Sequence, residues 1–174
     1  MRDNKDLYIG KDIDWFFVAN GHLCHVASAG GRIPSTLSEV DVASFFWAVW
    51  GYFDNLEELA QKEIDFFLDN NDGHLVRING KYIYQRFVGN SSISESEVRE
   101  DILNYLKPFV KMALRGCFSF DRTGIWDFDA PVYHLIAWPT NPIKLPIVDL
   151  PESRLDKLKG GDGIRLVEEI NRET

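Results

Sequence analysis

Residues 12–34 read DIDWFFVANGHLCHVASAGGRIP and carry the clearest fold signal of the chain. Residues 15–19 are an aromatic and β-branched run, Asn20-Gly21 follows, and residues 22–28 continue as a second extended segment. Asn-Gly readily adopts the positive φ values of a type I′ turn. The stretch therefore predicts a β-hairpin, which Gly30, Gly31 and Pro34 bring to an end.

The same turn chemistry recurs at Asn79-Gly80. Extended segments flank it at residues 75–78 and 81–88, which predicts a second hairpin. Further strands are predicted at residues 117–120 and 132–138, joined by a loop at residues 121–131.

Segments with helical periodicity lie between these predicted strands. Helices are predicted at residues 38–53, 55–70 and 94–115. Ser94 and Glu97 form a capping pair at the start of the third helix, which Pro108 is expected to kink or split and Gly116 to end. After residue 139, prolines keep the chain extended, and a short helix is expected at residues 150–158.

Length and composition favour a folded domain. The chain has 174 residues, of which 45% are hydrophobic and 13% aromatic, enough for one core. Together with the pattern of elements, this predicts a single α+β domain over residues 1–174, with an antiparallel sheet built from hairpins and packed against about three helices.

The charge balance narrows the choice of partners. Nineteen basic against 27 acidic residues give a net charge of −8, which repels nucleic-acid phosphates. The N-terminus is charged, and the most apolar run, residues 45–53, is too short to cross a bilayer. Only Cys24 and Cys117 occur, which fits a reducing compartment and small buried thiols. We expect a cytoplasmic protein that binds neither nucleic acid nor membranes.

His22, Cys24 and His25 form the most inviting cluster of chemical groups. In an extended strand, His25 points away from His22 and Cys24, so at most two of the three could bind one metal ion. No spacing requires His74, His134 or Cys117 to complete a site, and no nucleophile elbow, phosphate loop or zinc motif occurs. The sequence therefore predicts no metal, no cofactor and no catalytic set.

The strongest charge asymmetry lies along the second predicted helix. Residues 54–72 contain seven acidic residues and one lysine. The candidate partner-binding residues are Glu57, Glu58, Asp65, Asp69 and Asp72. A basic segment with Arg77, Lys81 and Arg86 follows, and we expect it to pair with acidic residues of neighbouring elements.

A small-molecule or carbohydrate site, including that of a hydrolase, is the alternative. It would use the paired carboxylates Asp127 and Asp129 with the aromatic Trp126, in a cleft that also includes His134. Surface loops are commonly rich in such residues. A third interpretation is a homodimer formed through the aromatic helix at residues 42–53.

Several segments carry a family resemblance. In chain order they are Asp14-Trp15-Phe16, Gly21, residues 28–31, Ile33-Pro34, residues 115–121 and 133–139, Pro142 and Leu150-Pro151. They resemble a family of small bacterial proteins with a DWF-type strand and a glycine-turn hairpin, similar to the immunity proteins of toxin systems. A long insert at residues 56–92 departs from the family pattern.

The resemblance implies a protein-binding role and assigns no individual binding residue. The resemblance and the acidic helix together support one leading hypothesis. In this hypothesis, the chain is a non-catalytic protein that neutralises a basic, toxin-like protein partner.

Overall fold

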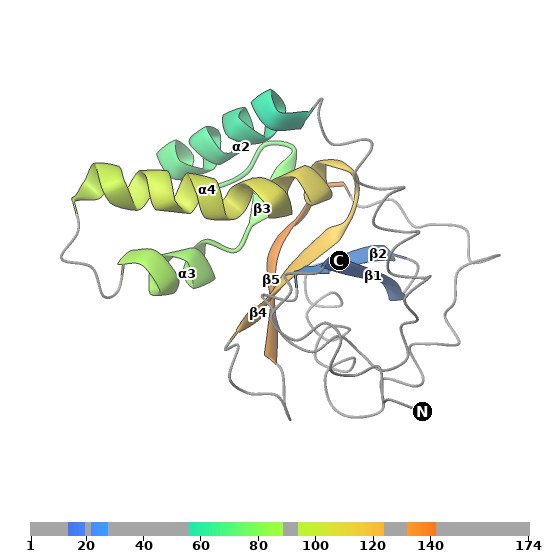
Figure 1. The fold of residues 1–174 in the computed structure, drawn as a ribbon. Helices are drawn as coiled ribbons and strands as arrows, with labels where there is room; N and C mark the ends of the chain where they lie inside the picture. Colours follow the sequence, from blue (N-terminus) through green and yellow to red (C-terminus); the bar gives the residue numbers. More distant parts are fainter. Residues whose placement is uncertain (1–13, 20–21, 28–55, 89–93, 124–131, 142–174) are drawn as a thin grey trace.

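The computed structural model of the protein describes residues 14–19, 22–27, 56–88, 94–123 and 132–141. Here the chain forms a five-stranded sheet with helices packed beside it, as Figure 1 shows. The predicted α+β class is confirmed. The predicted helix at residues 38–53, the glycine turn after the first hairpin and the segment beyond residue 141 lie outside the described residues.

The sheet has the strand order β1-β2-β4-β5-β3. Its strands are β1 (Asp14–Ala19), β2 (His22–Ala27), β3 (Val76–Ile78), β4 (Phe118–Thr123) and β5 (Val132–Pro139). Three neighbouring pairs are antiparallel, and β2 pairs with β4 in parallel. The parallel pair arises because the chain passes through all of the described helices between these two strands.

The first predicted hairpin is confirmed in its strands. β1 and β2 are antiparallel, and Ala19 lies opposite His22. This register suits the two-residue connection that Asn20-Gly21 was expected to make, although those two residues lie outside the described part.

The second predicted hairpin is wrong. Asn79-Gly80 starts a helix, α3 (Gly80–Ile83), which continues as the π-helical turn η3 (Tyr84–Val88). The Asn79 side chain accepts a hydrogen bond from Tyr82 N at 3.2 Å, as an N-cap does, and donates one to the Leu135 carbonyl at 2.9 Å. β3 therefore pairs with the distant strand β5.

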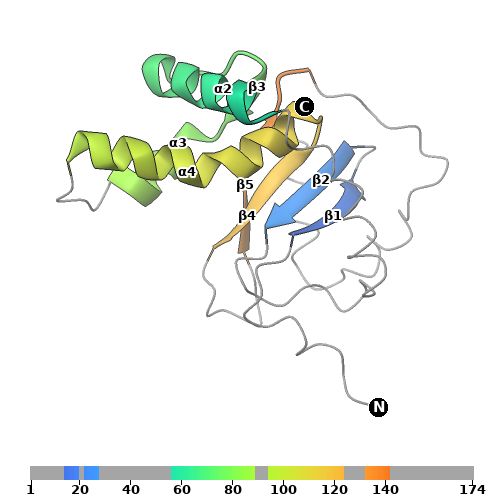
Figure 2. The same ribbon diagram turned by 45° about the horizontal axis from the view of Figure 1, so that its top comes forward.

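The two long helices are α2 (Glu57–Asn70) and α4 (Glu95–Leu114); α4 packs against β3, β4 and β5, and α2 lies beside α4 (Figures 1 and 2). Both were predicted, and the Ser94–Glu97 capping box is present. The two helices run antiparallel, since Glu57 pairs with Lys111 at one end and Asp69 with Arg99 at the other.

Pro108 lies within α4, which continues from Glu95 to Leu114, so of the two predicted effects, a kink or a split, the split does not occur. Burial of the turns around it, including Leu106, Phe109 and Val110, holds the helix together through the proline. Gly116, with φ of 92°, ends the helix as predicted.

The loop predicted from residue 121 begins too early, because β4 extends to Thr123. Asp121 and Arg122 are buried in this strand. A buried aspartate is tolerated there because its carboxylate accepts hydrogen bonds from Tyr105 and Arg86.

The described core has two main clusters. One joins the helices to β3 and β5 and includes Ile64, Phe67, Ile83, Leu106 and Ile136. The other lies on the sheet and includes Trp15, Phe118, Phe120, Tyr133 and Trp138. Cys24 and Cys117 are both buried, as expected, and form no disulfide. Among the described residues, no helix combines the length and the apolar character needed to cross a membrane.

Candidate functional site

The acidic residues at the start of α2 already have cationic partners. Glu57 contacts Lys107 at 3.3 Å and also Lys111, both on α4. Glu58 contacts Lys62, one turn along α2, at 2.7 Å. The hydrogen bond from Lys111 is the main cause that lowers the pKa of Glu57. Charge at this end of the helix pair is therefore largely balanced.

At the other end of the α2–α4 pair, the acidic residues outnumber the cations. Asp65 and Asp69 share one cation, Arg99 of α4, at 2.9 Å and 3.0 Å. A hydrogen bond from Gln61, followed by that from Arg99, lowers the pKa of Asp65. Asp72, just beyond α2, accepts a hydrogen bond from Gly73 N at 2.9 Å.

We call residues 65–72 and 95–101 the acidic end of the helix pair. They hold seven carboxylates against one guanidinium, that of Arg99. Carboxylates at the N-terminus of α4 suit its dipole, but Asp69 lies in the last turn of α2, which contains no basic residue. An acid there opposes the dipole, at a typical cost of about 0.3–1 kcal/mol.

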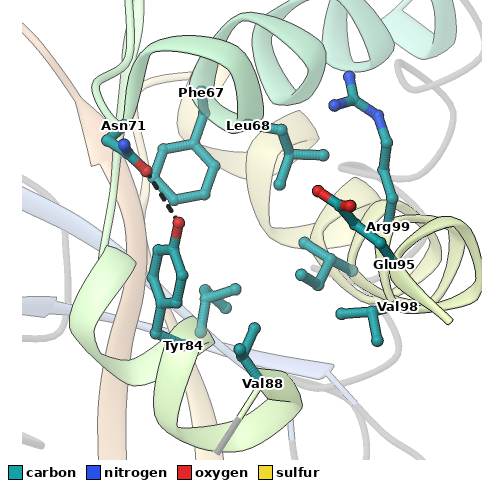
Figure 3. A pocket seen from close by; sticks show the side chains of 10 residues that line it. Phe67, Leu68, Asn71, Tyr84, Val88, Glu95, Val98 and Arg99 are labelled. Carbon is teal, nitrogen blue, oxygen red and sulfur yellow. Dashed lines mark hydrogen bonds between the residues drawn. The ribbon is translucent and has the colours of Figure 1, made fainter. Parts of the chain in front are cut away.

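A pocket of about 440 Å³ opens at this end, between α2, η3 and α4. Its floor is apolar, formed by Phe67, Ile83 and Ile102, and Leu68 and Val98 form its walls. The volume lies within the ~300–1,000 Å³ usual for ligand sites. Figure 3 shows side chains from all three elements converging on it.

The mouth of the pocket combines apolar and polar groups. Tyr84 and Val88 of η3 are 52% and 46% exposed, and the Tyr84 hydroxyl donates to Asn71 Oδ1 at 3.1 Å (Figure 3). The Glu95 carboxylate points toward the opening, whereas Arg99 reaches away toward α2. Within the described part of the chain, no ion pair or hydrogen bond engages the Glu95 carboxylate.

The predicted basic segment does not pair with α2. Arg86 of η3 instead contacts Asp121 of β4 at 3.2 Å and the Tyr82 hydroxyl at 2.9 Å, and it lies 4.5 Å over the Tyr105 ring. Arg77 and Lys81 are exposed. The predicted charge pairing with a neighbouring element is confirmed for Arg86, whose partner lies on the sheet.

Tyr105 and Asp121 form the centre of this polar cluster. The Tyr105 hydroxyl donates to Asp121 Oδ2 at 2.5 Å. Burial, reinforced by the Asp121 charge, raises the pKa of Tyr105 well above its ordinary value. The phenol therefore stays protonated and acts as a hydrogen-bond donor to the carboxylate.

His134, the described member of the alternative site, lies beside this cluster. Its ring stacks on Tyr82 with centroids 4.7 Å apart. Trp126, Asp127 and Asp129 lie outside the described residues. The described groups offer an aromatic surface next to a guanidinium, which is suited to binding a polar ligand.

His22, Cys24 and His25 are all buried. His25 Nδ1 lies 2.6 Å from Ser119 Oγ, and Nε2 lies 3.3 Å from Asp14 Oδ2. This is the acid–base–hydroxyl order of a hydrolytic triad, but His25 and Ser119 are both fully buried, so no substrate could reach the hydroxyl. The Ser119 hydroxyl pairs with Nδ1 of the buried histidine, while Nε2 lies near the Asp14 carboxylate without hydrogen-bond geometry.

Metal binding finds no support in the described residues either. No group of three or more His, Cys, Asp or Glu side chains in the described ranges could hold a metal ion.

Sequence reasoning missed the pocket and the Asp121 cluster. Both depend on contacts between different elements, such as Tyr84 with Asn71 and Tyr105 with Asp121, which lie 13 and 16 residues apart in the chain. The one local sequence pattern near the pocket is Asn79-Gly80. This dipeptide is equally compatible with a hairpin turn and with the N-cap of a helix.

Comparison with known proteins finds no matching family model, no matching curated protein and no matching solved structure.

Proposed function

We propose that the protein is a non-catalytic binding protein that captures a basic protein partner through the acidic end of its α2–α4 helix pair. The single observation that carries this proposal is the uneven distribution of charge along the pair. Glu57 and Glu58 are balanced by lysines at one end, while residues 65–72 and 95–101 at the other hold seven carboxylates and one cation, Arg99, which contacts Asp65 and Asp69.

Two acids of the acidic end are not explained by the stability of the helices. Asp69 lies where the helix dipole of α2 disfavours a negative charge, and Glu95 of α4 lines the pocket without a cationic partner in the described part of the chain. Such an arrangement is unfavourable within one molecule and becomes favourable when a basic surface approaches it. Complementary charge also speeds the encounter and excludes acidic partners.

The proposed role is neutralisation of a toxin-like protein, in line with the resemblance to immunity proteins. An immunity protein must act quickly and at low concentration, and electrostatic steering provides such rapid association. Of the five acidic residues predicted from the sequence, Asp65, Asp69 and Asp72 belong to the proposed surface, and Glu95 of α4 joins them.

An affinity capture from extracts of the native host, at low and at high salt, tests this function. The protein should retain one basic protein that is released as salt screens the charges. The captured protein should inhibit growth when expressed alone and be harmless when co-expressed with this chain. A partner that is acidic, or that remains bound at high salt, would count against the proposal.

Two double variants test which end of the helix pair binds the partner. Asp72→Asn with Glu95→Gln removes two charges from the acidic end, and Glu57→Gln with Glu58→Gln removes two from the balanced end. We expect the first pair to lose the partner and the second to keep it. Equal capture by both would show that the location of the charge is irrelevant.

The second candidate function is small-molecule or carbohydrate binding near His134. It is favoured by the Tyr82–His134 stack beside Arg86, because aromatic surfaces with a few polar groups are typical of such sites. A thermal-shift screen against simple sugars tests it. A stabilising sugar should lose its effect in Tyr82→Ala, and a screen without any shift removes this candidate.

A further inference from the structure

We propose that the pocket between α2, η3 and α4 receives the apolar face of an amphipathic, basic helix of the partner. This inference rests on the proposed function and specifies how the partner is held. The partner helix would place apolar side chains one turn apart in the pocket and Lys or Arg side chains against the acidic end.

The shape of the site favours a helix over a single side chain. The pocket volume of about 440 Å³ exceeds what one apolar side chain fills, and the pocket extends along the last turn of α2 and the first two turns of α4. A helix laid in such a groove inserts residues spaced three or four apart, the usual mode of helix-in-groove recognition.

The chemistry of the floor requires apolar contacts. Phe67, Ile83 and Ile102 are buried and carry no polar atom on their side chains. A charged or highly polar group placed here would lose its hydration without compensation. The occupant must therefore present aliphatic or aromatic groups to the pocket.

The chemistry of the mouth requires cations beside those apolar groups. Glu95 points toward the opening without an ion pair in the described structure, and the only guanidinium of the acidic end is taken by Asp65 and Asp69. A Lys or Arg next to the inserted side chain would find its counter-ion in Glu95. An acidic occupant would meet repulsion from seven carboxylates.

The η3 turn presents the remaining wall. Tyr84 and Val88 project from it and remain about half exposed, which leaves apolar surface at the mouth for an occupant to cover. A π-helical turn is a rare local structure and occurs often at functional sites. Here it places Tyr84 and Val88 on the pocket side while Arg86 anchors the turn to Asp121.

The test is binding of labelled synthetic helices, followed by fluorescence anisotropy. The first probe is an amphipathic helix of leucine and lysine. The second keeps its lysines but replaces each leucine by glutamine, and the third keeps the leucines but replaces each lysine by glutamate. We expect the first probe alone to bind well, with shifts in the methyl resonances of Leu68 and Val98.

A matched pair of variants locates the binding. Val88→Lys and Leu75→Lys add the same charge at apolar side chains that are both 46% exposed, but only Val88 lines the pocket. Val88→Lys should weaken binding of the first probe by about tenfold, the scale of a lost anchor contact, while Leu75→Lys leaves it unchanged. Glu95→Gln should weaken binding more than Glu100→Gln.

The outcomes separate this inference from the proposed function. If the first two probes bind equally and Val88→Lys behaves like Leu75→Lys, the acidic surface acts without the pocket and the inference is wrong. If no lysine-containing probe binds, or the glutamate probe binds as well, the proposed function fails too. A dimer in solution that Val88→Lys dissociates would show that a second copy occupies the pocket, which also overturns the inference.

Discussion

The guanidinium of Arg99, in the second turn of α4, lies 3.0 Å from the carboxylate of Asp69, in the last turn of α2. The same guanidinium contacts Asp65 at 2.9 Å. Arg99 therefore joins the two helices and is also the only cation within the acidic end. Its removal should affect folding and binding in opposite directions.

Arg99→Met is expected to lower the free energy of unfolding by about 1 kcal/mol, because it breaks two exposed ion pairs. It should strengthen binding of a basic partner several-fold, since Asp65 and Asp69 lose their counter-ion and the acidic end becomes more negative by one charge. Denaturant unfolding and partner titration measure the two effects. Arg77→Met removes an equal charge from an exposed position on β3 and serves as the control. Weaker partner binding by Arg99→Met would contradict the account.

Glu57→Gln should lower stability at neutral pH and leave partner binding intact. The contacts with Lys111 and Lys107 lower the pKa of Glu57 below its ordinary value of 4.5, so their stabilisation is complete above that pH and is lost as the pH falls through the lowered pKa. Because Glu57 is half exposed, we expect a difference of only about 0.3–1 kcal/mol.

Unfolding of wild type and Glu57→Gln, followed across the acid range, measures this dependence. The two curves should converge at low pH. Glu100→Gln, at an exposed position of α4, should follow the wild type at every pH. A constant offset between wild type and Glu57→Gln would mean that charge is not the cause.

Glu63 is a buried carboxylate that organises the turn from α2 into β3. Its Oε2 accepts hydrogen bonds from the backbone N–H groups of His74, Leu75 and Val76 at 3.2, 2.8 and 3.3 Å. Glu63→Ala should cost about 1–3 kcal/mol, because buried donors lose their acceptor. Chemical denaturation measures the loss, with the exposed Glu58→Ala as the reference. Similar stabilities of the two variants would refute this role of Glu63.

Cys117 should be unreactive in the folded protein. Burial raises the pKa of its thiol to about 12, so little thiolate forms at mildly alkaline pH. Mass spectrometry after iodoacetamide treatment should show slow labelling in buffer and rapid labelling in denaturant. Labelling at equal rates in both conditions would show that the thiol is accessible.

Elements with a complete local signal could be predicted from the sequence. The capping box of Ser94 and Glu97 starts α4 at the predicted place because both partners lie within one turn. The strands of the first hairpin were likewise found, since their alternation and the Asn-Gly between them agree. In these cases the local sequence and the final packing favour the same structure.

The wrong predictions occur where a contact with another element determines the local structure. Asn79-Gly80 could form a turn, but the side-chain amide of Asn79 donates a hydrogen bond to the Leu135 carbonyl. β3 pairs with β5 and not with the residues that follow Gly80. Asp121 looks like the start of a loop, yet Tyr105 satisfies its carboxylate inside the sheet. Both contacts join residues of different elements, at least 16 positions apart in the chain, which no local pattern encodes.

The candidate site was also predictable only in part. The acidic character of α2 could be read from composition, and Asp65, Asp69 and Asp72 lie together at one end. The sequence could not show that lysines of α4 balance Glu57, nor that Glu95 lies across a pocket from Leu68. Antiparallel packing of α2 on α4 separates the balanced end from the acidic one.

The most direct test of the central claim is a calorimetric titration of the captured partner, at rising salt, into wild type and the two charge-pair variants. We predict that affinity falls steadily with salt, that Asp72→Asn with Glu95→Gln weakens it about tenfold or more, and that Glu57→Gln with Glu58→Gln leaves it near wild type. An affinity that is independent of salt, or equal losses in both variants, would contradict a binding role for the acidic end.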